Sequence, residues 1–294
     1  RIRRPIRHRN GPGGKGSQEV TDRRIAIVAH PERGVDDGSV STITGLLRDS
    51  GLSVDPHPDR DSVGGCELIL VVGGDGTILR AAELSRAVGV PILGVNYGHV
   101  GFLSEAKPDE APDVVAQIVE RRWGVDPRMT IDIAVSRPDG SVAHDWALNE
   151  VAMERDVDSR TFEASIGVDG CELSSFKVDT VLFSTATGST AYNFSGGGPI
   201  VWPDVEAMVL TPVAAHALFT RPLVVGPASR LELHVVDGDA RAKCDGRREL
   251  MAPAGSSITA VKGSHPVLLA RLDDVPFSGR LVDKFKLPVH GWRE

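Results

Sequence analysis

Residues 70–77 (Leu-Val-Val-Gly-Gly-Asp-Gly-Thr) combine the end of an apolar run with three glycines, one carboxylate and one hydroxyl group. Glycine lets the backbone approach a ligand closely, and the first turn of a following helix offers unpaired N–H groups to phosphate oxygens. The segment matches neither the P-loop nor the Gly-x-Gly-x-x-Gly fingerprint. Because Asp75 would repel phosphate, we expect it to bind a hydroxyl group, accept a proton or contact a metal ion. The composition equally allows a tight turn in which Asp75 caps the helix.

A long polar segment, residues 184–199, follows the apolar run Val178–Phe183. It holds several Ser and Thr hydroxyl groups and four glycines around Tyr192, whose ring can form one wall of a base pocket. Neutral donors and acceptors of this kind suit the sugars and bases of nucleotides. An irregular surface loop is the alternative, but a long polar loop that follows a buried strand is more often functional.

The dipeptide Asn149-Glu150 is the third polar site. The Asn149 amide can donate and accept hydrogen bonds, whereas an ionised Glu150 carboxylate only accepts them. An ionised carboxylate is a natural partner for the hydroxyl groups of a ribose. Taken alone, the dipeptide equally fits a solvated strand end.

Charge is unevenly distributed along the 294 residues, which carry a formal net charge of −7. The basic excess lies in the first 24 residues, and the rest of the chain is acidic. An acidic body argues against a protein that mainly binds nucleic acid or anionic membranes. The three cysteines, Cys66, Cys171 and Cys244, fit neither a disulfide framework nor a zinc site, and they indicate buried, reduced thiols.

The elements that must position the polar segments change character along the chain. Before about Trp123, buried strands alternate with helical spacing, which predicts a Rossmann-like parallel α/β domain. Strands are expected there at residues 24–30, 68–72 and 90–95. Helices are expected at residues 39–50 and 108–122, and a further helix is expected to open within residues 73–77 and to run through residue 87. Later apolar runs are short, separated by Gly, Asp and Pro, and predict a mostly antiparallel β region with strands at residues 129–135, 142–153, 161–168, 178–184, 231–236, 242–244 and 258–261.

Together these segments resemble the NAD kinase family, the enzymes that phosphorylate NAD to NADP. The resemblance extends from Arg24 to Trp292. It is carried by residues 73–77 (Gly-Gly-Asp-Gly-Thr), residues 96–103 (Asn-Tyr-Gly-His-Val-Gly-Phe-Leu), Asn149-Glu150, residues 187–192 (Thr-Gly-Ser-Thr-Ala-Tyr) and residues 195–199 (Ser-Gly-Gly-Gly-Pro).

The resemblance implies roles for single residues. Asp75 is similar to the family's catalytic acid–base residue. Asn149 and Glu150 match the pair that holds the adenosine of the substrate, and Asp179 matches an acid near the ribose hydroxyl groups. The other residues that the resemblance places at the substrate are Gly74, Gly76, Arg80, Phe102, Arg160, Lys177, Thr187, Thr190, Ala191, Tyr192, Asn193, Phe194, Ser195 and Arg247.

Several of these assignments carry an alternative or a departure from the family. Arg160 and Lys177 stand near basic positions that contact phosphate or a neighbouring subunit, and exposed surface charges are the alternative for both. Asp179 is followed by Thr180, where the family has a glycine, so the backbone there has less freedom.

Composition, the rhythm of the elements and the resemblance together predict how the chain is organised. We expect a disordered basic tail (1–23), an α/β domain with the Gly-Gly-Asp-Gly-Thr loop (24–125) and a β-rich NAD-binding domain (126–275). A final tail (276–294) would return to the N-terminal domain. The family also implies a homodimer or homotetramer in the cytoplasm, with no nucleic-acid or membrane partner.

The implied reaction transfers the terminal phosphoryl group of ATP, or of polyphosphate, to the 2′-hydroxyl group of the NAD adenosine ribose. Asp75 would accept the hydroxyl proton, and Mg²⁺ on the donor would neutralise phosphate charge. Positioning should matter more than basicity, because the transition state is loose.

Two other functions remain open at this point. Kinases of the related lipid kinase and phosphofructokinase superfamily share a similar glycine-rich loop, but Asn149-Glu150 and residues 187–192 argue against them. A non-catalytic NAD(P)-binding sensor is the second alternative, and the presence of Asp75 argues against it.

Overall fold

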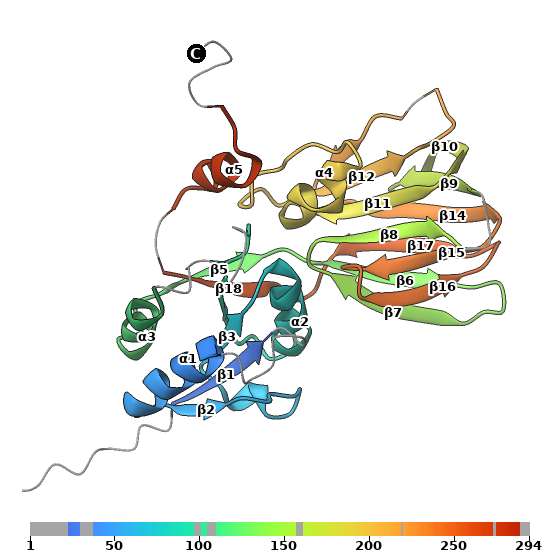
Figure 1. Cartoon of the computed structure of the whole chain (residues 1–294). Helices are drawn as coiled ribbons and strands as arrows, with labels where there is room; N and C mark the ends of the chain where they lie inside the picture. The colour runs from blue at the N-terminus through green and yellow to red at the C-terminus, as the bar shows by residue number, and fades with distance from the viewer. Residues whose placement is uncertain are drawn as a thin grey trace, which may run out of the picture.

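The computed structural model describes residues 23–29, 38–96, 101–104, 110–156, 161–218, 220–272 and 275–288. They form an N-terminal α/β domain and a C-terminal β-rich domain, which lie side by side in Figure 1. This fold class is the one that the sequence predicts. The basic N-terminal segment 1–22 and Arg160 lie outside the described residues.

The α/β domain contains one six-stranded sheet with the strand order β2-β1-β3-β4-β18-β5. Its strands are parallel except for β5, which runs antiparallel to β18. Its elements are β1 (Arg24–Ala29), α1 (Gly38–Asp49), β2 (Ser53–Asp55), η2 (Val63–Gly65), β3 (Leu68–Val72), α2 (Asp75–Ser85), β4 (Ile92–Val95), α3 (Ala111–Val119), β5 (Gly124–Arg128) and β18 (Val267–Arg271).

Both faces of this sheet are covered, as its continuous apolar strands require. All five residues of β3 are buried, which is typical of a parallel strand with helices on both sides. Apolar residues of α1 and α3 pack on one face, and those of α2 pack on the other. The buried Leu148 of the β-rich domain joins the α2 cluster, so α2 lies between the two domains.

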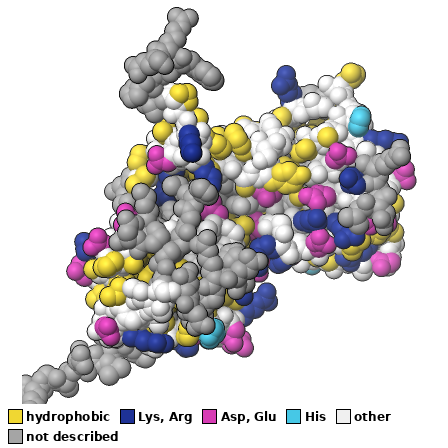
Figure 2. Space-filling model, viewed as in Figure 1, with side chains coloured by type: hydrophobic (Ala, Val, Ile, Leu, Met, Phe, Trp, Pro, Cys, Tyr) yellow, Lys and Arg dark blue, Asp and Glu magenta, His cyan; other side chains and the backbone are white. Residues whose placement is uncertain are grey.

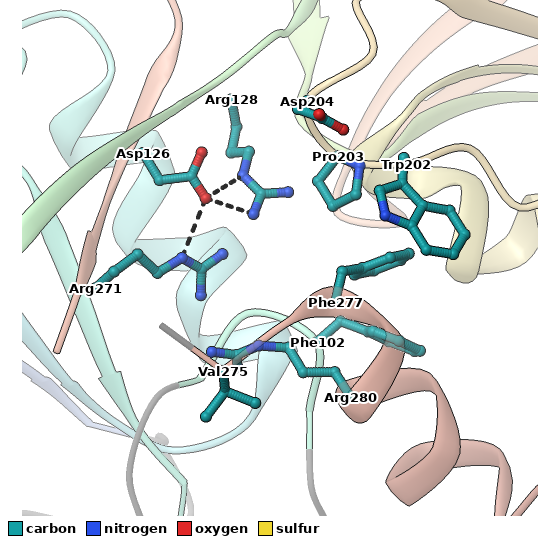
Figure 3. A pocket seen from close by; sticks show the side chains of 10 residues that line it. All are labelled: Phe102, Asp126, Arg128, Trp202, Pro203, Asp204, Arg271, Val275, Phe277 and Arg280. Carbon is teal, nitrogen blue, oxygen red and sulfur yellow. Dashed lines mark hydrogen bonds and ion pairs between the residues drawn. The ribbon is translucent and has the colours of Figure 1, made fainter. Parts of the chain in front are cut away.

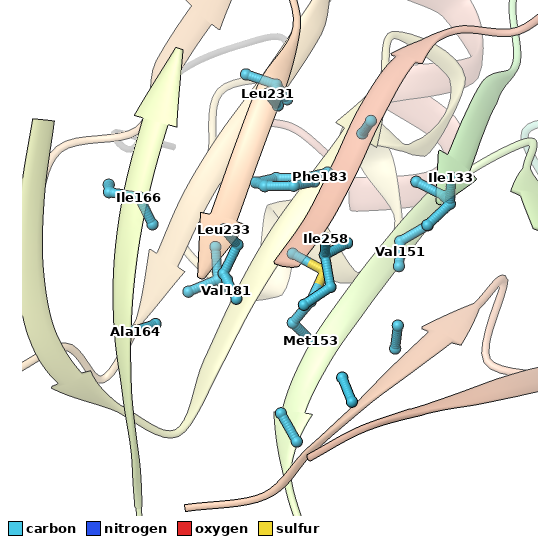
Figure 4. Packing of buried hydrophobic residues seen from close by; sticks show 14 of the residues in the cluster. Ile133, Val151, Met153, Ala164, Ile166, Val181, Phe183, Leu231, Leu233 and Ile258 are labelled. Carbon is cyan, nitrogen blue, oxygen red and sulfur yellow. The ribbon is translucent and has the colours of Figure 1, made fainter. Parts of the chain in front are cut away.

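The β-rich domain consists of two antiparallel six-stranded sheets, in the orders β10-β9-β14-β17-β6-β7 and β13-β12-β11-β8-β15-β16. One apolar core combines residues of both sheets, including Ile133, Met153, Phe183 and Leu233 (Figure 4). Its elements are β6 (Ile131–Ser136), β7 (Val142–Ala147), β8 (Glu150–Arg155), β9 (Phe162–Val168), β10 (Cys171–Val178), β11 (Thr180–Thr185), η4 (Thr187–Thr190), α4 (Tyr192–Ser195), β12 (Met208–Val213), β13 (Leu223–Val225), β14 (Leu231–Asp237), β15 (Ala240–Cys244), β16 (Arg248–Ala252) and β17 (Ser257–Lys262).

Some details differ from the sequence-based expectation. The single strand expected at residues 142–153 is two strands, β7 and β8, separated at Leu148 and Asn149. Strand β18 lies in the α/β sheet, between β4 and β5, although its residues were assigned to the β-rich segment 126–275. Cys66 and Cys244 are buried thiols, as expected, but Cys171 is exposed.

The last described helix, α5 (Phe277–Phe285), contacts residues 102–104, which follow β4 in the chain. The ring of Phe102 is 5.9 Å from that of Phe277 and 5.8 Å from that of Phe285. Arg280 Nη1 donates a 2.6 Å hydrogen bond to the carbonyl oxygen of Ser104. Phe285 also contacts Phe194 of α4, with ring centroids 4.5 Å apart, so α5 touches both domains.

Candidate active site

Asp75 is the first residue of α2 and directly follows the turn after the buried strand β3. Its Oδ2 accepts a 3.1 Å hydrogen bond from the Phe102 N–H, and its Oδ1 accepts one of 3.2 Å from the Leu103 N–H. A Cβ atom at Gly101 would collide with the Asp75 carboxylate, so only glycine lets the loop approach this closely. The half-buried carboxylate is therefore fixed between a helix N-terminus and a loop.

Asn149 and Glu150 lie where β7 ends and β8 begins, and Asp245 fixes the backbone there. The Asp245 carboxylate accepts hydrogen bonds from the N–H groups of Leu148 (3.0 Å) and Asn149 (2.7 Å). The Asp245 N–H in turn donates to the Glu150 carbonyl oxygen at 2.9 Å. Asp245 thus sets the backbone position of both residues that were predicted to hold the adenosine.

The polar segment 184–199 is held against the same point. The Thr185 N–H donates to the Asn149 carbonyl oxygen at 2.9 Å, and Thr185 Oγ1 donates to the Leu148 carbonyl oxygen at 2.6 Å. A Cβ atom at Gly188 would collide with the Asn149 backbone. This glycine is therefore required for the close approach of the loop to Asn149.

Glu150 is 8% exposed, and its Oε2 has no hydrogen-bond partner among the described residues. Burial, helped by the nearby carboxylate of Asp245, raises the pKa of Glu150 to about 8, and a hydrogen bond from the Tyr192 backbone opposes this only in part. We expected an ionised Glu150, but a carboxyl group with this pKa holds its proton at neutral pH. It can therefore donate a hydrogen bond as well as accept one.

Residues of η4 and α4 divide into those that face solvent and those that hold the loop. Tyr192 and Phe194 are 37% and 42% exposed, and Ser195 is also exposed. Thr190 and Ala191 are half-buried, and Thr187 is buried. Asn193 is fully buried, with its amide nitrogen bound to the carbonyl oxygens of Ser189 and Pro199 and its oxygen bound to Thr211 Oγ1. Its side chain therefore stabilises the loop from the inside.

The other predicted residues lie on several elements. Gly74 precedes α2, Gly76 and Arg80 lie on its exposed side, and Phe102 is buried. Lys177 is exposed at the end of β10, and half-exposed Asp179 lies 4.0 Å from Arg155. Arg247 Nε donates a 2.7 Å hydrogen bond to Glu83 of α2. Arg247 is therefore anchored between the domains.

Asp245 is the residue that the sequence reasoning missed. It opens the turn between β15 and β16, where Asp245 (φ 53°) and Gly246 (φ 65°) both adopt positive φ. An Asp-Gly pair between two strands is the usual sequence signal for such a tight hairpin turn. That signal identifies the turn but not the two amide groups that the carboxylate binds.

Comparison with known proteins identifies the family of the chain. The family model described as the ATP-NAD kinase N-terminal domain matches residues 38–123, and the ATP-NAD kinase C-terminal domain matches residues 148–272. The chain belongs to the NAD kinase family. The NAD kinase of Thermobifida fusca is 45% identical over 302 residues, which cover 94% of this chain and 93% of that one. The NAD kinase of Rhodococcus jostii is 41% identical and covers 96% and 98%.

Solved structures of NAD kinases show the same fold. An NAD kinase from Archaeoglobus fulgidus in complex with ATP superposes with a TM-score of 0.75 at 29% identity and covers 90% of this chain and 98% of that chain. Yeast NADH kinase complexed with NADH gives a TM-score of 0.84 at 20% identity and covers 92% and 89%. The predictions of the NAD kinase family and of a kinase enzyme are therefore confirmed.

Proposed function

We propose that this NAD kinase transfers the terminal phosphoryl group of ATP to the adenosine 2′-hydroxyl group of NAD, with Asp75 as the proton acceptor. The observation that carries this proposal is the position of Asp75 on the first turn of α2, where two loop N–H groups orient both carboxylate oxygens. A carboxylate held in this way can orient a hydroxyl group and accept its proton as the phosphoryl group is transferred.

The two loop N–H groups that bind Asp75 hold its carboxylate in one orientation at the start of α2. Proton transfer is a minor demand in a loose phosphoryl-transfer transition state. The main contribution of Asp75 is therefore to hold the attacking oxygen in line with the donor.

For the adenosine of NAD, we propose contacts with Asn149 and Glu150, and for its ribose region a contact with Asp179. The protonated Glu150 carboxyl group supports this assignment, because its buried Oε2 has no partner among the described residues. A buried polar atom of this kind gains a hydrogen bond when a ligand hydroxyl or base nitrogen reaches it. The exposed ring of Tyr192 and the neighbouring residues 190–195 supply the surrounding wall.

Magnesium is proposed to arrive with the donor as MgATP. Within the segments described above, no group of three His, Cys, Asp or Glu side chains could hold a metal ion. Mg²⁺ is commonly held by substrate phosphates together with only one or two carboxylates. Polyphosphate, the alternative donor, presents the same chain of phosphate oxygens and would carry the ion in the same way.

The remaining proposals concern assembly and location. We propose a cytoplasmic homodimer or homotetramer without a nucleic-acid or membrane partner. Acidic and basic side chains are interspersed over the β-rich domain on the face shown in Figure 2, which supports the absence of a nucleic-acid surface there. In the described segments, no helix is long and apolar enough to cross a bilayer.

The direct test incubates the purified chain with NAD, ATP and Mg²⁺ and measures NADP with an NADP-specific dehydrogenase. Parallel reactions replace ATP with other nucleoside triphosphates or with polyphosphate, and NAD with NADH. We expect NADP from NAD and ATP. Absence of product with every donor would contradict the proposal and would favour a nucleotide sensor.

A further inference from the structure

Helix α5 has one apolar face, formed by Phe277, Leu281 and Phe285, which recur at every fourth residue. Leu281 is buried, and the two phenylalanines are half-buried. The helix is only nine residues long, and a helix of this length is marginally stable in water by itself. Contacts of the apolar face with the rest of the protein therefore hold α5 in place.

Each of the two phenylalanine rings of α5 contacts both domains. The ring of Phe277 lies 5.9 Å from that of Phe102 in the α/β domain and 5.1 Å from that of Trp202 in the β-rich domain (Figure 3). The ring of Phe285 lies 5.8 Å from that of Phe102 and 4.5 Å from that of Phe194 on α4. Phe102 is thus the residue of the α/β domain that both rings contact.

Phe102 is also one of the two residues that orient Asp75. Its ring packs on α5, while its backbone N–H donates to Asp75 Oδ2. The Leu103 N–H donates to Asp75 Oδ1, and the Ser104 carbonyl oxygen accepts a 2.6 Å hydrogen bond from Arg280 Nη1 of α5. Residues 102–104 are therefore held by Asp75 and by α5 at the same time.

The position of residues 102–104 depends on these contacts, because the segment belongs to no helix or strand. It also lies very close to Asp75, since a Cβ atom at Gly101 would collide with the carboxylate. A shift of the segment would therefore move the N–H groups that orient Asp75. A misplacement of about 1 Å at a reacting group can cost ~10²-fold in rate.

We propose that Phe285, together with Phe277, is a positioning residue that acts through Phe102 to hold the two N–H groups that orient Asp75. This inference rests on the proton-accepting role proposed above for Asp75 and assigns α5 a part in it. Because Phe285 also contacts Phe194, α5 keeps Asp75 aligned with the loop proposed to surround the adenosine.

The first test measures the single-turnover rate of NADP formation at saturating NAD and ATP. Phe285→Leu keeps an apolar side chain but removes the ring, and it should lower this rate about tenfold. Phe285→Tyr keeps the ring and should recover most of the rate. The control is Ile43→Val in α1, which packs on the sheet face opposite α2 and should lower stability but not the rate. A wild-type rate in Phe285→Leu would overturn the proposal.

Hydrogen exchange of the Phe102 and Leu103 amides, followed by NMR, provides a second measurement that does not depend on turnover. Both amides donate to Asp75, so their exchange should become about tenfold faster in Phe285→Leu and stay unchanged in Ile43→Val. A helix with a merely structural role would leave both amides as protected in Phe285→Leu as in Ile43→Val. That result would overturn the proposal even if the rate fell.

Asp75→Asn in the same rate assay separates this proposal from the proposed function. If Asp75→Asn loses its rate while Phe285→Leu keeps the wild-type rate, the role of α5 is wrong and the role of Asp75 stands. If Asp75→Asn keeps the wild-type rate, the role of Asp75 is wrong, and with it the part assigned to α5 in catalysis.

Discussion

Glu83 on α2 and Arg248 on β16 form an ion pair with a distance of 2.7 Å between Oε1 and Nη1. Arg248 also binds Asp145 at 2.9 Å and the Trp146 carbonyl oxygen at 2.5 Å, and its guanidinium group stacks over the Trp146 ring. Helix α2 begins with Asp75, and β7, which carries Trp146, ends next to Asn149. The ion pair between Glu83 and Arg248 therefore fixes the proposed catalytic residue relative to the proposed adenosine site.

Replacing Glu83 with Gln should loosen this connection. Burial alone would raise the pKa of Glu83, but the hydrogen bonds from Arg247 and Arg248 outweigh it and lower the pKa. A hydrogen bond to a charged group contributes about 1.5–3 kcal/mol, so Glu83→Gln should lower the urea midpoint and reduce kcat/KM. Glu206→Gln is the control, because its exposed pair with Lys262 should contribute little. Equal effects of the two variants would contradict the role of Glu83.

Asp75→Asn should abolish most turnover and preserve NAD binding. The amide has the same size but cannot accept the hydroxyl proton, and loss of a general base typically costs ~10²–10⁴-fold in rate. Single-turnover NADP formation measures the rate, and isothermal titration measures NAD binding. A variant with the wild-type kcat would show that Asp75 is not the proton acceptor.

Glu150→Gln should change how stability depends on pH. The folded-state pKa of Glu150 is about 8, which lies above the ordinary value of 4.5 for a glutamate, so the folded state binds the proton more tightly. Stability should therefore fall as the pH rises from 4.5 through 8. Thermal unfolding at pH 5.5 and 8.5 should show a smaller loss of Tm in Glu150→Gln than in the wild type. Glu172→Gln, an exposed change on β10, should keep the wild-type slope.

Gly188→Ala and Gly45→Ala should have opposite effects on stability. The new methyl group at position 188 would meet the Asn149 backbone, and overpacking typically costs about 1–3 kcal/mol. Gly45 lies inside α1 with open space around it, so alanine there should stabilise the protein by about 0.5–1 kcal/mol. Chemical unfolding measures both. Gly188→Ala should also raise the KM for NAD, and a neutral result would contradict the close approach.

Glu67→Gln should weaken the protein most at neutral pH. Burial opposes ionisation of Glu67, but hydrogen bonds from Arg121 and Arg23 outweigh it and lower the pKa to about 2. The resulting stability is present above pH 4.5 and is lost as the pH falls towards 2. The difference in urea midpoint between wild type and variant should therefore shrink from pH 6 to pH 3. The exposed Glu120→Gln should show no such trend.

The sequence predicts the fold class and the segments of the site because each depends on local pattern. Strand β3 is recognisable from five consecutive apolar residues, and Asp75 from the glycines around it. The raised pKa of Glu150 could not be predicted from local sequence, because it depends on burial and on the carboxylate of Asp245, which lies far away in the sequence.

The position of β18 was also unpredictable, because a short apolar run does not specify its partner strand. β18 inserts between β4 and β5, and its residues Val267, Leu269 and Ala270 complete both cores of the α/β sheet. During synthesis, β4 therefore has an unpaired edge until almost the whole chain has left the ribosome. The first half cannot finish folding before the second half is made, and a ribosome that stops early releases a chain with an open, aggregation-prone sheet edge.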